Sequence, residues 1–198
     1  MVVSRLFFSI FFLVVGLGLV TSKRAFAEKS FSGPYVGLGL GYGYHHAWFN
    51  GISYKGMSVA TGSHLGYGWL QNHLYYGLEG DIAYDTFSKK KGVSQVKEGL
   101  SMGASFRLGR LLRNTFLPFM RLGVRYDKYA LRSLNAKKEH FFAEMLVMGI
   151  GVDAFFSNRF SLRSEFDYAL CMGLKRAKAS ASKKPLHSSL MMGISYHL

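Results

Sequence analysis

The feature that most constrains the fold is a two-residue alternation between apolar and small or polar side chains, which recurs along most of the chain. The last stretch, Leu186 to Leu198, shows it most simply, because every second residue from Leu198 back to Leu190 is apolar. Successive side chains of a β-strand point to opposite faces, so we predict a strand with one apolar and one small, mostly polar face. Such a strand suits either a soluble sheet or a membrane barrel, and the rest of the chain has to distinguish them.

The segment Tyr35 to Tyr44 repeats this design with four glycines on one face. Its glycines alternate with valine, leucine and tyrosine over about ten residues, the length of a tilted strand that crosses a bilayer. They do not fit the G-x-G-x-x-G motif, so no dinucleotide site is expected. Six further alternating segments bring the number of predicted strands to eight, and they lie within 59–69, 74–84, 100–109, 120–127, 148–154 and 160–170.

The connections between the predicted strands alternate in length. Short links are expected near 70–73, 110–115 and 155–159, and long links near 45–57, 85–97, 127–141 and 171–185. Strict alternation of short and long links is typical of an up-and-down antiparallel meander. Because eight is an even number, the first and last strands run antiparallel and can close the sheet into a barrel without free edges.

Charged residues share the small-residue face of the predicted strands, whereas the opposite face is almost entirely apolar and aromatic. In water an exposed apolar band of this extent would aggregate. In lipid the same pattern is expected, with apolar side chains outward and polar side chains inward. Aromatic residues toward both ends of the outward face match two interfacial girdles. The predicted fold class is therefore all-β, an eight-stranded antiparallel up-and-down transmembrane β-barrel.

The chain is expected to begin with a signal peptide, residues 1–27, followed by one outer-membrane barrel domain, residues 28–198. An apolar run from Leu6 to Val20 precedes an Ala-Phe-Ala cleavage signal. The run is about 15 residues long, shorter than the roughly 20 that a membrane-spanning helix needs. We therefore expect export and cleavage before Glu28, with an uncleaved anchor as the alternative.

Five segments carry a family resemblance, and they read GPYVGLGLGYG, YYGLEGDIAY, FLPFMRLGVRY, LRSEFDY and LHSSLMMGISYHL. They resemble the small eight-stranded outer-membrane barrels of Gram-negative bacteria, the opacity-type surface proteins and the OmpA-type membrane domain. The resemblance covers all of residues 28–198. It implies a place in the cell outer membrane, contact with lipid and lipopolysaccharide, and a role as surface antigen, adhesin or envelope anchor. Leu198 departs from the family, whose last residue is usually phenylalanine.

The inward charges are predicted to pair with one another inside the barrel. Side chains just fill the interior of an eight-stranded barrel, and buried charges need partners, so a closed ion-pair network is expected. The predicted network comprises His64, Glu79, Asp81, Arg107, Arg121, Arg125, Asp153, Arg163, Glu165 and Asp167. The alternative is a narrow ion path that opens when these charges exchange partners, which would make the protein a small channel or porin.

Two histidines, His45 and His187, are predicted to face inward near the outer rim of the first and last strands, which closure makes neighbours. They are weak candidates for a shared metal or haem contact, and the alternative is two rim histidines exposed to water. His187 also forms a His-x-Ser pair with Ser189, the spacing that resembles barrel enzymes that deacylate lipid A. No acidic residue follows the pair, and both side chains are expected inside, so neither catalysis nor a cofactor is predicted.

The predicted long loops hold most of the positive charge of a chain whose formal net charge is +14. The basic loop residues include Lys89, Lys90, Lys91, Lys137, Lys138, Lys175, Arg176, Lys178, Lys183 and Lys184. They are expected either to neutralise lipopolysaccharide phosphates or to contact anionic host glycans or surface proteins. Nucleic acid is disfavoured because no aromatic platform accompanies the lysines of the fourth loop. The predicted function is a monomeric, non-enzymatic surface barrel with an envelope-structural or adhesive role.

Overall fold

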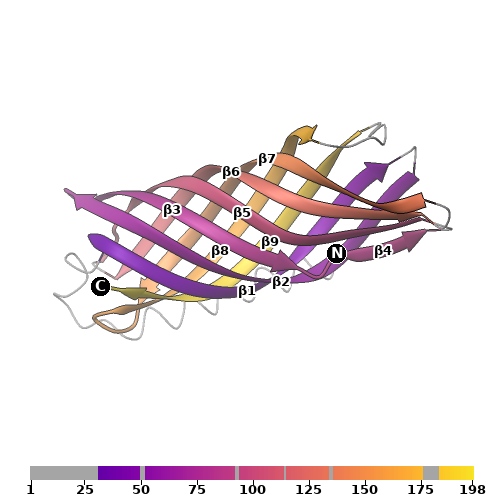
Figure 1. The fold of residues 1–198 in the computed structure, drawn as a ribbon. Helices are drawn as coiled ribbons and strands as arrows, with labels where there is room; N and C mark the ends of the chain where they lie inside the picture. The colour runs from indigo at the N-terminus through magenta and orange to yellow at the C-terminus, as the bar shows by residue number, and fades with distance from the viewer. Residues whose placement is uncertain (1–30, 50–51, 92–93, 114, 134–135, 176–182) are drawn as a thin grey trace, which may run out of the picture.

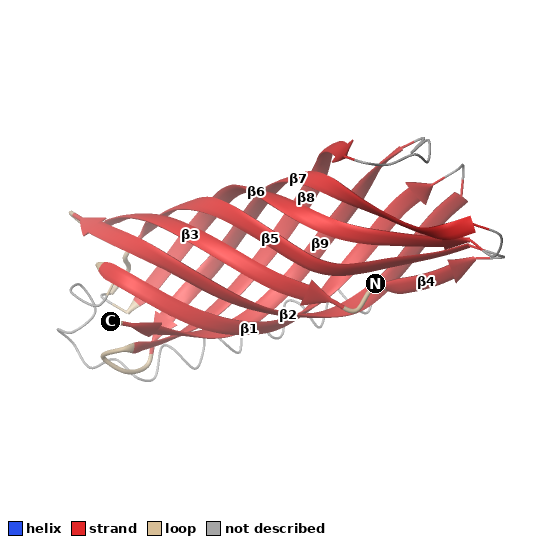
Figure 2. Ribbon diagram, viewed as in Figure 1, coloured by secondary structure: helices blue, strands red, loops and turns tan. Residues whose placement is uncertain are grey.

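The computed structural model of the chain describes residues 31–49, 52–91, 94–113, 115–133, 136–175 and 183–198. Strand makes up nearly all of these residues (Figure 2). The strands are β1 (Gly33–Phe49), β2 (Ile52–Gln71), β3 (Leu74–Asp85), β4 (Ser88–Lys91), β5 (Ser94–Arg110), β6 (Phe116–Ser133), β7 (Ala136–Phe155), β8 (Phe160–Lys175) and β9 (Lys183–His197). Within these ranges no helix is long and apolar enough to span a membrane. The predicted signal peptide, 1–27, and its cleavage site before Glu28 lie outside the described residues.

The strands form one closed sheet, an elongated barrel whose strands are tilted against its long axis (Figure 1). Every neighbouring pair is antiparallel, and β3 and β4 both pair with β5. These two strands are therefore successive segments of one barrel strand, interrupted at Thr86 and Phe87. The prediction of an eight-stranded antiparallel barrel is confirmed. The terminal strand β9 closes it by pairing with β1, with Ser195 opposite Gly37.

One end of the barrel carries tight turns close to the C-terminus. The turn between β2 and β3 consists of Asn72 and His73, whose φ angles are 49° and 65°. Two consecutive positive φ angles define the turn that suits the right-handed twist of a two-residue hairpin, and asparagine tolerates them. In outer-membrane barrels the end with tight turns faces the periplasm, so the opposite end is extracellular.

The prediction of long extracellular loops is wrong for most of the residues involved. The segments 45–57, 85–97 and 127–141 are largely strand, and the strands there are separated by 50–51, by Thr86 and Phe87, by 92–93 and by 134–135. The strands continue because the alternation continues. Its inward positions simply change from glycine and charged residues to aromatic and aliphatic ones, as at Tyr54 and Val96.

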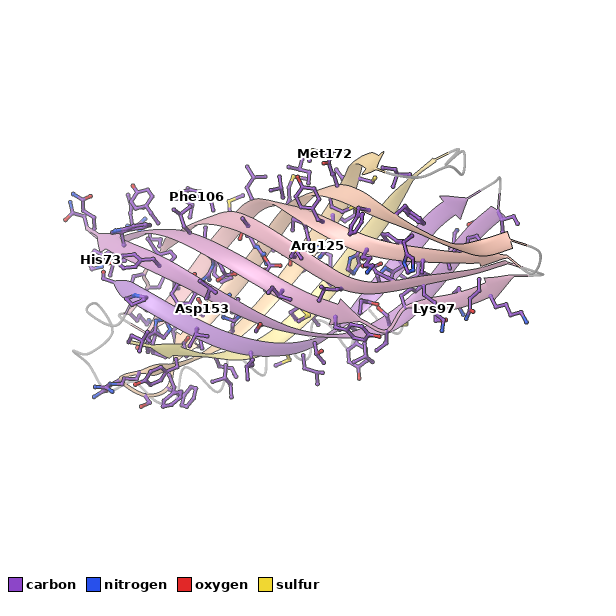
Figure 3. All side chains as sticks on the ribbon, viewed as in Figure 1. His73, Lys97, Phe106, Arg125, Asp153 and Met172 are labelled. Carbon is purple, nitrogen blue, oxygen red and sulfur yellow. The ribbon has the colours of Figure 1, made fainter. Side chains whose placement is uncertain are left out.

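An apolar belt surrounds the middle of the barrel. Leu38, Leu65 and Met120 expose about two thirds of their surface, and Phe106 points outward (Figure 3). Four exposed tyrosines bound the belt on the extracellular side, namely Tyr44, Tyr84, Tyr126 and Tyr168. Such aromatic girdles mark the two membrane interfaces, and Tyr67, Trp69 and Tyr76 are exposed toward the periplasmic side.

Beyond the tyrosine girdle the two faces of the strands exchange character. The inward side chains there form an apolar cluster, which we call the extracellular plug: Tyr54, Phe87, Val96, Tyr129, Phe141, Ala143, Met145, Val147, Ala169 and Cys171. The outward side chains include exposed Lys55, Lys97 and Lys128. This part of the barrel is therefore built for water outside, and it projects beyond the membrane as a continuation of the same strands.

A second apolar cluster, the periplasmic plug, closes the other end of the lumen. It consists of Phe31, Tyr75, Leu111, Leu117 and Phe155. The rings of Phe31 and Phe155 meet edge to face with centroids 4.4 Å apart. The lumen is thus apolar at both ends, and its polar side chains lie between the two plugs.

Candidate functional site

The charges closest to the periplasmic plug form a ring that we call the inner network: Glu79, Arg107, Asp153 and Arg163. Asp153, which is labelled in Figure 3, accepts from Nη2 of Arg107 at 2.7 Å and from Nε of Arg163 at 2.9 Å. Glu79 accepts from Nη1 of Arg163 at 2.7 Å and from the hydroxyl of Tyr35 at 2.9 Å. All four charged side chains are buried. Two arginines balance two carboxylates, as burial of charge requires.

A second group gathers around Arg121, whose guanidinium contacts Asp81, Glu165 and Asp167. The contact to Asp167 is 3.3 Å long. One arginine here faces three carboxylates. The group, which we call the Arg121 group, therefore has more negative than positive charge when every carboxyl is ionised.

The third group, the histidine cluster, lies nearer the extracellular plug and comprises His45, Asp85, Glu98, Arg125, Asp127 and His187. His45 lies between two carboxylates, with Nδ1 2.9 Å from Oε2 of Glu98 and Nε2 3.2 Å from Oδ2 of Asp85. The imidazole of His187 stacks on that of His45, with centroids 4.1 Å apart. Arg125 donates to both oxygens of Asp127, at 2.7 and 3.0 Å, and also contacts Nδ1 of His187.

A glycine provides the space for the stacked histidines. A Cβ atom at Gly43 would lie 2.8 Å from Nε2 of His187 and 2.9 Å from Nε2 of His45, so no larger residue fits this position without displacing the rings. A cavity of about 80 Å³ adjoins the cluster. Asp85, Glu98 and His187 line it, together with Arg121 from the neighbouring group, so the cavity connects the two groups.

The described lumen holds more carboxylates than arginines. The eight carboxylates are Glu79, Asp81, Asp85, Glu98, Asp127, Asp153, Glu165 and Asp167, and the four arginines are Arg107, Arg121, Arg125 and Arg163. Uncompensated charge is costly in a low-dielectric interior. Protons, charged histidine or bound cations must therefore complete the balance.

Most predicted lumen residues meet as partners, but two are placed differently from the expectation. Nε2 of His64 forms a hydrogen bond with Oγ of Ser195 at 2.9 Å. His64 forms no ion pair within the described residues. Arg125 belongs to the histidine cluster and not to the groups around Glu79 and Arg121. The interpretation of His45 and His187 as water-exposed rim residues is wrong, because the extracellular plug covers them and both are buried.

Three acidic residues of the histidine cluster were missing from the predicted network. Asp85 continues the inward alternation of Asp81, but the predicted strand, 74–84, ended one residue before it. Asp127 was the last inward residue of the predicted segment 120–127, but it was not included in the network. Glu98 is buried because the pairing of β5 with β6 shifts between Glu98 and Ser101. Such a bulge reverses the faces of the residues beyond it, and Gly99 within it is a signal that the sequence offers, because a glycine inside a strand often marks a bulge.

The His-x-Ser pair is not arranged for catalysis in the described lumen. His187 and Ser189 are both buried and face inward. The Nδ1 atom of His187 lies against a guanidinium, where a catalytic histidine would need a carboxylate to orient it. The haem contact is also excluded, because the stacked rings leave no space for a porphyrin and the adjoining cavity of about 80 Å³ is far too small.

The basic residues of the extracellular end divide into described and undescribed positions. Lys89 and Lys90 are exposed on β4, and Lys97 is exposed on β5 (Figure 3). Lys91, Lys137, Lys138, Lys175, Lys183 and Lys184 lie near strand ends at the same end of the barrel. Arg176 and Lys178 lie outside the described residues.

The apolar belt, the two aromatic girdles and the ion-paired lumen together define a transmembrane barrel of the bacterial outer membrane. Residues 12–184 match the family model described as "Outer membrane protein beta-barrel domain", and the chain belongs to this family. It is therefore an outer-membrane protein, as the sequence predicted.

Curated relatives include the 25 kDa outer-membrane immunogenic protein of Brucella abortus, which is 29% identical over 142 residues. The match covers 71% of this chain and 66% of that protein, just under two thirds of its length. The corresponding protein of Brucella ovis is also 29% identical, over 71% of this chain and 70% of its own length.

Solved structures show the same fold at low sequence identity. Neisserial surface protein A is 17% identical with a TM-score of 0.59, over 84% of this chain and 98% of its own. Ail of Yersinia pestis, in complex with the heparin analogue sucrose octasulfate, is 15% identical with a TM-score of 0.53, over 84% and 99%. At these identities the likeness concerns the fold alone.

Proposed function

We propose that this outer-membrane barrel is a non-enzymatic adhesive surface protein that binds anionic polysaccharides through lysines at its extracellular end. The observation that carries the proposal is the exposure of Lys89 and Lys90 on β4, beyond the tyrosine girdle of a barrel whose lumen is filled. Residues at the ends of a rigid scaffold are well placed to contact a partner. Lys91 and the other lysines at the strand ends add charge of the same sign.

Sulfated glycans are the ligand class that this proposal favours. The structure of Ail, a protein with the same fold, contains the heparin analogue sucrose octasulfate. Fold likeness alone does not transfer a ligand. It supports the choice of heparin as the first probe, because exposed lysines attract sulfate groups through charge and not through a specific pocket.

Heparin binding to intact cells tests the adhesive role. We expect cells that display the chain to bind labelled heparin, and salt to weaken this binding. The triple variant Lys89→Gln, Lys90→Gln, Lys91→Gln should bind several-fold less. The matched control is Arg110→Gln with Arg113→Gln, which neutralises two exposed cations near the periplasmic turns. Equal heparin binding by the lysine variant and the wild type would refute the proposal.

A second role, in envelope structure, is favoured by the outward lysines directly beyond the girdle. On β6 exposed Lys128 lies two residues farther toward the extracellular end than exposed Tyr126, on the same face, and on β2 exposed Lys55 lies two residues farther than exposed Met57. Lys97 occupies the corresponding outward position of β5. We propose that these three residues, the lysine collar, contact the phosphates of outer-leaflet lipopolysaccharide, where opposite charges meet at the interface.

Lipopolysaccharide that remains bound during purification tests the second role. The triple variant Lys55→Gln, Lys97→Gln, Lys128→Gln should retain several-fold less lipopolysaccharide in mild detergent than the wild type. The Lys89, Lys90 and Lys91 variant should retain as much as the wild type and serves as the control. If the two variants behave alike, the collar has no separate role.

A further inference from the structure

Two stacked histidines and a glutamate bring three metal-ligating atoms together inside the barrel. One ligand atom each from His45, Glu98 and His187 lies within 4.8 Å of the other two. His45 and His187 are direct cross-strand partners at the seam between β1 and β9. Glu98 reaches them from β5, which is not adjacent to either strand. All three residues are buried, and Nε2 of His187 has no hydrogen-bond partner among the described side chains.

We propose that this trio binds a divalent transition-metal ion of the zinc class, through Nδ1 of His45, a carboxylate oxygen of Glu98 and Nε2 of His187. Two imidazoles and one carboxylate are a ligand set that suits zinc. Small movements of the side chains bring atoms at these separations to the bond lengths of about 2.0–2.2 Å that zinc requires.

The surroundings of His45 orient it as a ligand. Its Nε2 is 2.8 Å from Oγ of Ser58 and 3.2 Å from Oδ2 of Asp85. Asp85 is itself fixed, because it accepts hydrogen bonds from Ser58 at 2.9 Å and from the backbone N–H of Phe87 at 2.7 Å. A carboxylate next to one ring nitrogen of a histidine keeps the proton on that nitrogen, here Nε2. The other nitrogen, Nδ1, is then free to bind metal. Asp85 is therefore a positioning residue.

The charge of the cluster favours a cation. Asp85, Glu98 and Asp127 are opposed by one arginine, Arg125. A divalent ion supplies the two missing positive charges without crowding the site with a further side chain. The neighbouring cavity of about 80 Å³, lined by Glu98 and His187, is large enough for a water molecule as a fourth ligand.

Arg125 sets the main cost of binding. A guanidinium only donates, so Nδ1 of His187 accepts from Arg125, and Nε2 carries the proton of the neutral ring. Metal coordination at Nε2 requires this proton to move to Nδ1 and Nη2 of Arg125 to withdraw from it. The hydrogen bond from Nε of Arg125 to Asp127, at 2.7 Å, holds the guanidinium inside the cluster during this change.

Zinc content of the refolded, untagged barrel tests the site. The protein is folded into detergent micelles with ZnCl2, freed of loose metal by gel filtration, and analysed by mass spectrometry for bound zinc. We expect about one zinc per barrel. His187→Ala and Glu98→Gln should lower zinc affinity more than tenfold, and Asp85→Asn about 10–100-fold through the orientation of His45.

His73→Asn is the matched control, because it removes an exposed histidine from the periplasmic turn and asparagine tolerates the positive φ there. Gel mobility before and after boiling shows whether each variant has folded. Glu98→Gln nearly preserves the shape of the side chain and decides the matter if His187→Ala does not fold. A folded wild type without zinc, or equal zinc in the wild type and Glu98→Gln, would overturn the proposal.

Discussion

Arg107 shows how a single residue keeps a full charge in the interior of the barrel. Its side chain is completely buried, and its guanidinium lies 3.6 Å from the centre of the Phe119 ring. Asp153 and Glu79 accept its hydrogen bonds at 2.7 and 3.4 Å. The aromatic face and the two carboxylates replace the water that the arginine would otherwise hold.

Replacement of Arg107 should therefore destabilise the barrel more than replacement of an exposed arginine. We expect Arg107→Met to lower the free energy of unfolding by about 3–5 kcal/mol, because Glu79 and Asp153 lose a partner while buried. Urea unfolding in detergent micelles, followed by tryptophan fluorescence, measures the change. Arg110→Gln on the same strand should shift it by less than about 0.5 kcal/mol. A small effect at Arg107 would mean that water enters the inner network.

The strands of this barrel run from the lipid of the membrane into extracellular water, and the residue types on their two faces change between these surroundings. Within the belt their outward side chains are apolar, as at Leu40, and beyond the girdle lysines appear on the same face, as at Lys55. The inward side chains change in the opposite sense, from charged Glu79 in the inner network to Tyr54 in the extracellular plug. The point at which the outward and inward side chains change character therefore marks the boundary of the membrane on the strands.

A charge placed at two depths tests this boundary. Leu40→Arg, in the middle of the belt, should cost about 2–4 kcal/mol of folding free energy in lipid, whereas Met57→Arg, directly opposite Tyr44 in the girdle, should cost about 0–1 kcal/mol. Both residues are about 60% exposed, so burial within the protein does not distinguish them. Equilibrium folding into phospholipid vesicles measures both values. Equal costs would place the interface elsewhere.

The extracellular plug should hold the projecting part of the barrel together independently of the belt. Phe141 is buried and stacks on Tyr129 with ring centroids 5.3 Å apart. Phe141→Ala should lower the free energy of unfolding of this part by about 3–5 kcal/mol, because it removes buried packing contacts. We expect faster trypsin cleavage at the extracellular lysines, while the boiling-dependent gel shift remains. The adjacent Phe142 is only partly buried, so trypsin should cleave the Phe142→Ala variant at the same rate as the wild type.

The alternation predicted the strands, their order and the facing of Arg107 and Asp153, because these depend only on a period of two. It did not predict which charges meet, since Arg107 on β5 and Asp153 on β7 lie on strands that are not adjacent. It also failed where apolar residues moved to the inward face, because the sense of the alternation reverses there: Tyr54 and Val96 are buried and the neighbouring Lys55 and Lys97 are exposed. The place of Glu98 depends on a bulge, which no periodic pattern contains.

The described part of the barrel is filled with side chains and is not an open tube. Three layers of charged and polar side chains lie between two apolar plugs, and the cavity within them holds about 80 Å³. Eight strands leave no more space than their inward side chains occupy. The alternative function of a small channel therefore has no open path in the described part of the barrel.

Permeation through reconstituted protein checks this conclusion. Liposomes that contain the barrel should swell no faster in an isotonic sugar solution than empty liposomes, because no sugar crosses the lumen. A porin of sixteen strands, reconstituted at the same protein-to-lipid ratio, is the positive control. Swelling near the rate of that porin would show that the plugs open in the membrane.

The lysine collar also affects how long the barrel stays in place. Withdrawal toward the periplasm would draw Lys55, Lys97 and Lys128 through hydrocarbon, and each costs about 2–4 kcal/mol at the midplane. Insertion has to overcome the same barrier, so unassisted entry is slow. Once the collar has crossed, the cost of moving the three lysines back through the hydrocarbon opposes withdrawal. The barrel is then kinetically trapped in the membrane, at a depth that its own side chains determine.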